Sequence, residues 1–135
     1  MSYKIAEIEG IGKTYRAKLA KVGVVTTAGL LKSCSDRKGR RSTSKSSGLS
    51  EKQLLKWANM ADLMRISGIG KQYAEILENA GVDTVKELRR RNASSLAAKA
   101  QEVNAKKKLA RVAPSEKRIS GWIEQAKALT PLISH

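Results

Sequence analysis

The chain has 135 residues, of which 41% are hydrophobic and only 4% aromatic, and its formal net charge is +15. This length fits one domain or two very small ones, and an apolar content without Phe indicates helical cores of Leu, Ile, Val and Ala. The only cysteine is Cys34 and the only histidine is His135, which excludes an internal disulfide framework and a Cys/His metal cluster. We therefore expect neither a metal nor a cofactor.

The positive charge is spread over the whole chain. Residues 1–64 contain 13 Lys and Arg against 5 acids, a net charge of +8, and residues 65–135 contain 14 against 7, a net charge of +7. Such a balance favours a polyanion as partner, most often nucleic acid, and a membrane surface is the weaker alternative. No signal peptide or membrane span is evident, so we expect a cytoplasmic protein, nucleoid-associated if it binds DNA.

In the first half, expected helices alternate with turns. We predict a short helix over Ser2–Ile8, a turn at Gly10–Gly12, and a helix over Lys13–Val22 that ends at a glycine. Another helix is expected from Thr26 to Cys34. The Arg-, Lys- and Ser-rich segment 35–47 follows and is either a mobile basic loop or a weak polar helix. It serves either as a solvated surface or as an arm that contacts phosphates.

The remaining elements begin with recognisable helix signals. Capping boxes stand at Ser50–Gln53 and Thr84–Glu87, the second of which opens a helix ending in Arg89–Arg91. A helix over Lys71–Ala80 lies between them. The last two helices are predicted to begin at Asn92 and after Pro114.

The chain contains an internal repeat. Between Ile8 and Leu31, 11 of 24 residues are identical to those found 58 positions later. The cap and the tryptophan of the following helix recur at an offset of 65, as Ser50 and Trp57, then Ser115 and Trp122. We interpret the tryptophans as core residues rather than base-stacking platforms. The repeat predicts an all-α protein of two tandem units, residues 1–64 and 65–135.

Each unit carries two glycines around one apolar residue, at Gly10–Gly12 and Gly68–Gly70. Glycines allow tight turns with dihedral angles that side chains forbid, and the middle isoleucine is expected to point inward. Each turn opens a helix, whose free N–H groups and positive dipole end attract anions. Lys13 and Lys71 come next and add a full positive charge. These features suit a phosphate.

This stretch resembles the helix-hairpin-helix motif of DNA repair and recombination proteins, Gly-apolar-Gly followed four residues later by Ala. The second copy matches in full through Gly68, Gly70 and Ala74, whereas the first has Arg16 at the alanine position. The resemblance implies that backbone amides hold a phosphate without reading base sequence. The alternatives left open are a hairpin that serves only as a helix corner and an Arg16 that itself contacts the ligand.

Nearly the whole chain resembles a family of bacterial and archaeal proteins with two tandem helix-hairpin-helix domains, catalogued as a domain of unknown function. Each unit is also similar to the small helical domain that precedes the ATPase core of RecA-like recombinases, a SAM-like fold. The resemblance implies the fold and, by analogy only, DNA binding. The segment Arg40–Ser44 departs from the family, which has a polar, acid-containing helix there. The stretches that carry the resemblance are Gly48–Trp57, Ala61–Ile66, Gly68–Tyr73, Ala80–Val85 and Trp122–Ala126.

The leading functional hypothesis is a non-enzymatic, sequence-independent nucleic-acid-binding protein, with double-stranded DNA favoured and RNA left open. A protein–protein adaptor is the alternative, and the oligomeric state is not indicated. An enzyme is disfavoured, because no positioned histidine or paired carboxylates are recognisable, so no catalytic residue is proposed. The candidate nucleic-acid-binding residues are Gly10, Gly12, Lys13, Arg16, Arg37, Lys38, Arg40, Arg41, Gly68, Gly70 and Lys71.

Overall fold

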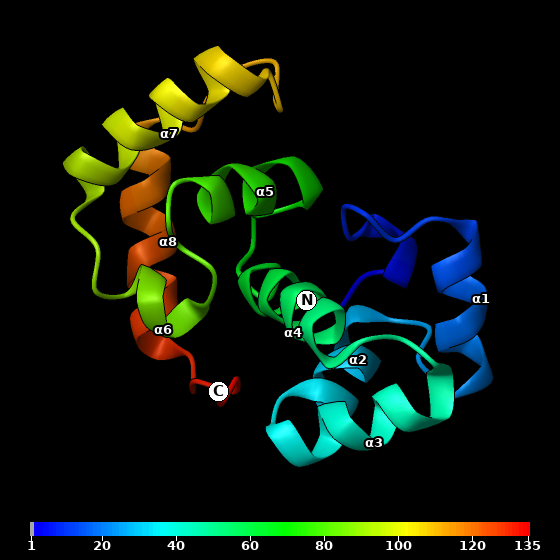
Figure 1. Cartoon of the computed structure of the whole chain (residues 1–135). Coiled ribbons are helices and arrows are strands. Elements are labelled where there is room, and N and C mark those ends of the chain that lie inside the picture. Colours follow the sequence, from blue (N-terminus) through cyan, green and yellow to red (C-terminus); the bar gives the residue numbers. More distant parts are fainter. Residues whose placement is uncertain (1) are drawn as a thin grey trace.

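The computed structural model describes residues 2–135, which form eight α-helices, one short 3₁₀ helix and no strand (Figure 1). The all-α prediction is confirmed. The elements are η1 (Ile5–Glu7), α1 (Lys13–Lys21), α2 (Thr27–Cys34), α3 (Arg37–Ser47), α4 (Glu51–Leu63), α5 (Lys71–Asn79), α6 (Val85–Leu88), α7 (Ala93–Lys107) and α8 (Glu116–Ala128).

Six of the helices begin at a residue whose side chain accepts a hydrogen bond from a backbone N–H three positions on. Such a cap satisfies one of the orphan donors at a helix start. The predicted starts at Ser50, Thr84 and Asn92 are confirmed. The full set of caps is Thr26, Asp36, Ser50, Thr84, Asn92 and Ser115.

Three expected elements differ in detail. Of the helix expected over Ser2–Ile8, only Ile5–Glu7 is helical, as the 3₁₀ helix η1, and Lys4 and Ile8 on either side are extended. Within the segment 35–47, Arg37–Ser47 forms the 11-residue helix α3, capped by Asp36, so the loop interpretation is wrong. The helix after Thr84 ends at Leu88, before the arginine run. Arg91 turns back instead, donating to the carbonyl of Gly81 at 2.8 Å and pairing with Glu87 at 3.1 Å.

The two halves of the chain share three of their helix–helix contacts. α2 packs on α4 as α6 packs on α8, α3 on α4 as α7 on α8, and α1 on α3 as α5 on α7. A buried tryptophan anchors each half. Trp57 lies 5.2 Å from the ring of Tyr15, and Trp122 lies 5.4 Å from the ring of Tyr73. The interpretation of both tryptophans as core residues is confirmed by their exposures of 3% and 2%.

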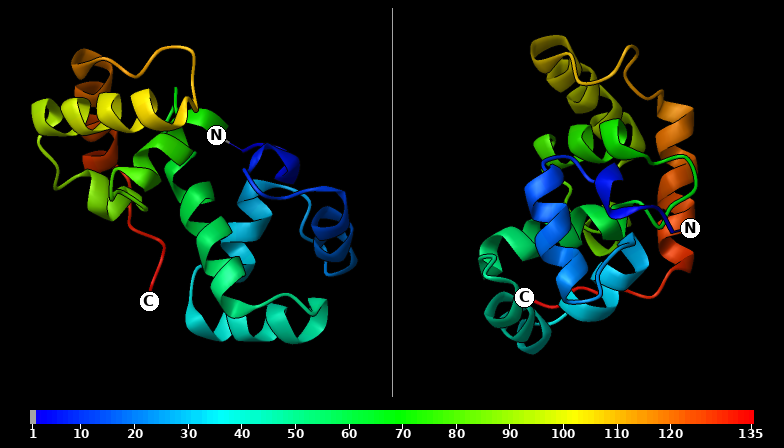
Figure 2. Two further views of the ribbon diagram at one scale, coloured as in Figure 1. Left: turned by 45° about the horizontal axis from the view of Figure 1, so that its top comes forward. Right: turned by 90° about the vertical axis from the view of Figure 1, so that its right-hand side faces the viewer.

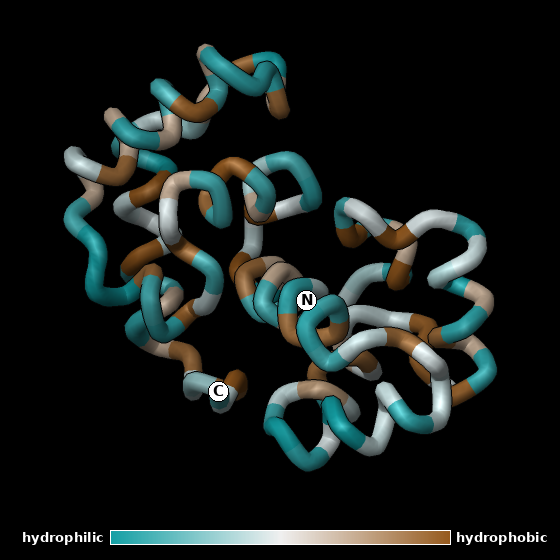
Figure 3. Tube along the Cα trace, in the orientation of Figure 1, coloured by the Kyte–Doolittle hydropathy of each residue, from teal (hydrophilic) through white to brown (hydrophobic). Residues whose placement is uncertain are grey.

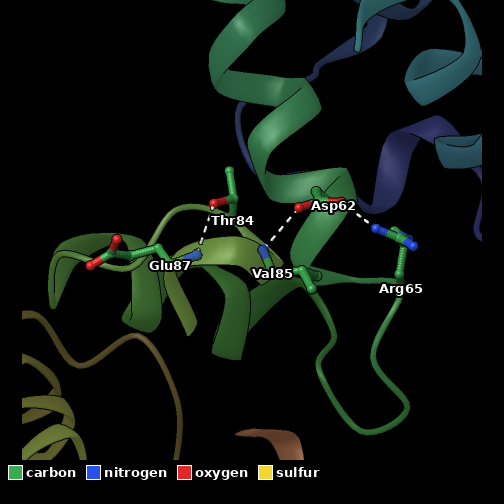
Figure 4. Close-up of polar contacts among 5 residues, drawn as sticks. All are labelled: Asp62, Arg65, Thr84, Val85 and Glu87. Carbon is green, nitrogen blue, oxygen red and sulfur yellow. Dashed lines mark hydrogen bonds and ion pairs between the residues drawn. The ribbon is translucent and has the colours of Figure 1, made fainter. Parts of the chain in front are cut away.

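Helix α4 stands between the halves and packs against α2 and α3 on one side and α5 on the other (Figures 1 and 2). At its end, the buried carboxylate of Asp62 accepts 2.8 Å hydrogen bonds from the N–H of Val85 and from Arg65 (Figure 4). These contacts cross the predicted boundary between residues 64 and 65, which stays a prediction.

The C-terminal segment returns to the first half of the chain. The N–H of Ser134 donates to the carbonyl of Ser35 at 2.8 Å, and the carbonyl of Ser134 accepts from Arg40 at 2.7 Å. The tail after α8 therefore fastens the second half to the junction of α2 and α3, in addition to the contacts made by α4 (Figure 2).

Candidate nucleic-acid interface

The two glycine turns, residues 8–12 and 66–70, have the same backbone. Gly10 and Gly68 have φ angles of 91° and 96°, which only glycine adopts readily. A Cβ added at Gly10 would lie 3.6 Å from the indole Nε1 of Trp57, and one at Gly68 would lie 3.1 Å from that of Trp122. The dihedral angle thus favours glycine at the first position of each turn, and at Gly68 the indole of Trp122 would also crowd a side chain, whereas 3.6 Å at Gly10 is an ordinary contact.

The second glycine of each turn is less constrained than the sequence predicted. Gly12 and Gly70 have φ angles of −86° and −98° with extended ψ, and a Cβ at either would meet open space. Any residue adopts this conformation. What Gly12 and Gly70 provide is a helix start with no side chain on the residue that precedes the helix. Between them and the first glycines, Ile11 and Ile69 are buried as expected.

Helices α1 and α5 begin at Gly12 and Gly70, and neither has a side-chain cap. The six other α-helices within residues 2–135 are all capped by a side chain. The first N–H groups of α1 and α5 therefore lack the local acceptor that the other helices have. Unpaired donors at the positive end of a helix dipole suit an anion.

The two turns differ in the surroundings of their lysines. Lys71 lies 3.5 Å from the carboxylate of Glu9, which belongs to the first turn, and both side chains are about half exposed. The fold thus places the first turn beside the start of α5 (Figure 1). Lys13 is exposed and has no ion-pair partner among the residues that the structure describes. Lys71, which belongs to the turn that matches the motif better, is therefore paired with a carboxylate of the same chain. Lys13, in the other turn, has no such partner within residues 2–135.

Arg16 also differs from its counterpart in the second half. It is exposed on α1 one turn after Lys13, whereas Ala74 occupies the same position in α5 and is fully buried. The Arg16 guanidinium is therefore available to a ligand on the surface of the first half.

Arg40 is not part of the candidate surface. Its side chain is buried, with 4% exposure, and it donates to the carbonyls of Cys34 at 3.0 Å and Ser134 at 2.7 Å. The sequence assigned Arg40 to a phosphate together with its neighbours, and the structure contradicts that assignment. Because residues three apart from Arg40 along the helix, such as Thr43, are buried with it, this face of α3 points into the fold.

The opposite face of α3 is exposed and basic. It carries Arg37, Lys38 and Arg41 as predicted, and also Lys45, which follows Arg41 by one helical turn. Lys45 was not among the predicted site residues, although the spacing of four residues signals it once the segment is known to be helical. α3 packs against α1, the helix that carries Lys13 and Arg16, and Figure 3 shows the polar character of α3.

A small acidic cluster lies where the first turn meets α5. Burial raises the pKa of Glu75, and the nearby carboxylates of Glu9 and Glu78 raise it further. Lys56 pairs with Glu78 at 3.8 Å across this junction. Within residues 2–135, no group of three acidic, cysteine or histidine side chains is arranged to hold a metal ion. The acidic cluster of Glu9, Glu75 and Glu78 therefore lies in the interface between the two halves of the chain.

Two further observations limit the chemistry of the chain. Cys34 is fully buried, and burial raises the pKa of its thiol, which disfavours the reactive thiolate. None of the helices in the described part of the chain is long and apolar enough to cross a membrane.

The chain belongs to the family described as "Domain of unknown function (DUF4332)", whose model matches residues 9–129. No curated protein and no solved structure shows a significant match to it. The matched region includes both glycine turns and ends with α8. Family membership therefore identifies the chain but brings no activity with it.

Proposed function

We propose that the protein is a non-enzymatic, sequence-independent binder of double-stranded DNA, and that its two glycine turns are helix-hairpin-helix motifs. The observation that carries this proposal is the start of α1. An uncapped, glycine-initiated helix end is exposed there beside two unpaired cations, Lys13 and Arg16. A backbone phosphate fits such a site, because amides and cations hold it without contacting a base.

The basic face of α3 supports the proposal. Arg37, Lys38, Arg41 and Lys45 add exposed positive charge on α3, the helix that contacts α1. A duplex presents phosphates at regular intervals, so a turn and an adjacent basic helix can neutralise several of them together. Single-strand binding by stacking is disfavoured, because Trp57 and Trp122 are buried.

The two turns are proposed to contribute unequally. The carboxylate of Glu9 lies 3.5 Å from Lys71 and adds a negative charge where a second phosphate would approach. The first turn is therefore the main phosphate site, and the second turn is weakened by an internal competitor. This reverses the order expected from the motif match, in which the second turn agreed better.

A titration of duplex DNA, single-stranded DNA and RNA at two salt concentrations tests the proposal. We expect duplex DNA to bind most tightly, with a log–log salt slope of roughly −0.9 for each phosphate neutralised and no preference among sequences. A flat slope, or no binding to duplex at low salt, would refute DNA binding. Tighter binding of RNA or single strands would assign a different nucleic acid.

Charge-matched variants separate the turns from bulk electrostatics. Lys13→Ala, Lys71→Ala and Lys106→Ala each remove one positive charge, and Lys106 is an exposed residue that pairs with Glu102 on α7. We expect Lys13→Ala to weaken duplex binding most, by about tenfold, and Lys106→Ala by less than about twofold. Lys71→Ala should fall between them, and Glu9→Gln should strengthen binding. Equal losses from all three lysines would reduce the turns to structural corners.

A protein–protein adaptor is the second candidate, because one surface of the first half has an apolar floor, with Ala17, Ala20 and Val25, beside its basic residues. That surface lies along α1 and has an occupied counterpart in the second half.

A further inference from the structure

The junction between the halves is a docking interface built from a turn and a groove. The turn residues Glu9 and Gly10, with Lys56 and Met60 of α4, face Glu75 and Glu78 of α5 across a small cavity of about 220 Å³. Two ion pairs join the sides, Glu9 with Lys71 at 3.5 Å and Lys56 with Glu78 at 3.8 Å. The surface of α5 is therefore covered by the preceding half of the chain.

The corresponding surface of the first half is uncovered. At an offset of 58 positions, Lys71, Ala74, Glu75 and Glu78 correspond to Lys13, Arg16, Ala17 and Ala20. These four α1 residues are all exposed, and Leu19 is the one residue of α1 that is buried. In α5, by contrast, Ala74, Ile76 and Leu77 are buried.

The uncovered surface is a groove of about 660 Å³, which we name the α1 groove. Its floor is apolar and includes Ala17, Ala20 and Val25, and Val25 is 56% exposed. Its rim is basic and consists of Lys4, Lys13 and Arg16. An exposed apolar floor inside a charged rim is the chemistry of an interaction surface.

We propose that the α1 groove binds a partner protein that presents an acidic side chain beside a glycine turn, as Glu9 and Gly10 are presented to α5. The acidic residue pairs with Lys13, as Glu9 pairs with Lys71. The small side chains of Ala17 and Ala20 replace Glu75 and Glu78, so the groove takes apolar or small groups where the second half takes Lys56. Charge complementarity selects an acidic partner for the basic rim.

A second copy of this chain lacks the required charge. The face of the second half that corresponds to the docked turn is itself open, in a hollow of about 500 Å³. It carries Ser67 where the first half has Glu9 and Arg118 where the first half has Gln53, and it keeps Lys117, which corresponds to Lys52. These cations would meet the basic rim of the α1 groove, and repulsion opposes the contact.

Self-association of a variant of this chain tests the proposal. The double variant Ser67→Glu with Arg118→Gln places on the second half the two residues found at the equivalent positions 9 and 53 of the first half. Sedimentation velocity would compare its self-association with that of wild type at low and at physiological salt. We expect wild type to stay monomeric, and the double variant to associate head to tail at least tenfold more tightly.

Reversal by a change within the groove completes the test. Ala20→Leu, added to the double variant, fills the floor of the α1 groove without changing its charge. Lys13→Gln, added separately, removes the partner of the new carboxylate. Each of these triple variants should be monomeric. Ala20 is exposed and Leu is a good helix former, so folding is preserved, which a thermal melt checks. Ala20→Leu alone should leave duplex DNA affinity unchanged, so failure of this proposal is distinguishable from failure of DNA binding.

Three results would overturn the proposal. Association of wild type as strong as that of the double variant would identify the occupant as a second copy of the chain. A double variant that stays monomeric would show that the groove does not accept an acidic turn. Association that survives Ala20→Leu would show that the contact forms elsewhere.

Discussion

The pair Gly68→Ala and Gly70→Ala tests how the glycine turns are built. Both variants add one methyl group two positions apart, and both lower the conformational entropy of the unfolded chain equally. Their folded states differ. Gly68 has a φ of 96°, and a Cβ added there would lie 3.1 Å from the indole Nε1 of Trp122. Gly70 has a φ of −98° and open space around it.

The magnitude follows from these two environments. A left-handed backbone costs an alanine about 1–2 kcal/mol, and the crowding against Trp122 adds a few tenths more. We therefore expect Gly68→Ala to be about 2 kcal/mol less stable than Gly70→Ala. With an unfolding entropy of about 2.1 cal/mol/K per residue over 135 residues, this difference corresponds to roughly 7 °C in Tm.

Thermal and urea unfolding followed by circular dichroism would measure this difference. The unfolded-state term cancels between the two variants, so the comparison isolates the native turn. Gly10→Ala and Gly12→Ala form a second pair, with a somewhat smaller difference expected because the Cβ at Gly10 would lie 3.6 Å from Trp57. Equal melting temperatures for Gly68→Ala and Gly70→Ala would refute the turn geometry described above.

Two further predictions concern buried or crowded charges. Arg40→Ala should destabilise the fold by about 1–3 kcal/mol in a urea titration, because the carbonyls of Cys34 and Ser134 lose their hydrogen-bond donor. The matched variant Arg41→Ala, at an exposed position, should leave the free energy of unfolding unchanged. Equal stabilities of the two variants would contradict the structural role of Arg40. Glu75→Gln should raise Tm at pH 7. Because the pKa of Glu75 is raised, its charged form is less favourable in the folded state than in the unfolded state. The stability that this group contributes is therefore lost as pH rises, and glutamine avoids that loss. The gain should vanish when the pH falls below the ordinary glutamate pKa of 4.5, and a gain that persists there would contradict the assignment.

Local signals in the sequence determined the helices and their repetition. Caps such as Ser50 and Thr84 mark helix starts because their side chains bond to N–H groups only three residues away. The inward positions of Trp57 and Trp122 follow from spacing along a helix, and that of Ile11 follows from its place between two turn glycines. The offset of 58 positions predicted that both turns share one geometry. These features depend on contacts close in sequence or on repetition, so they were predictable.

Only the tertiary structure decided which of the basic residues are free. The segment 35–47 has several cations, and the packing of α3 against α2 and α4 buries Arg40 while it leaves Arg41 exposed. Likewise, the docking of the first turn on α5 brings Glu9 to Lys71 across 62 positions of sequence and leaves Lys13 unpaired. The pairing of two such distant residues depends on how the halves are joined, and no spacing pattern encodes that. The repeat therefore predicted one backbone geometry for both turns, whereas the contact between the halves gives their lysines different surroundings.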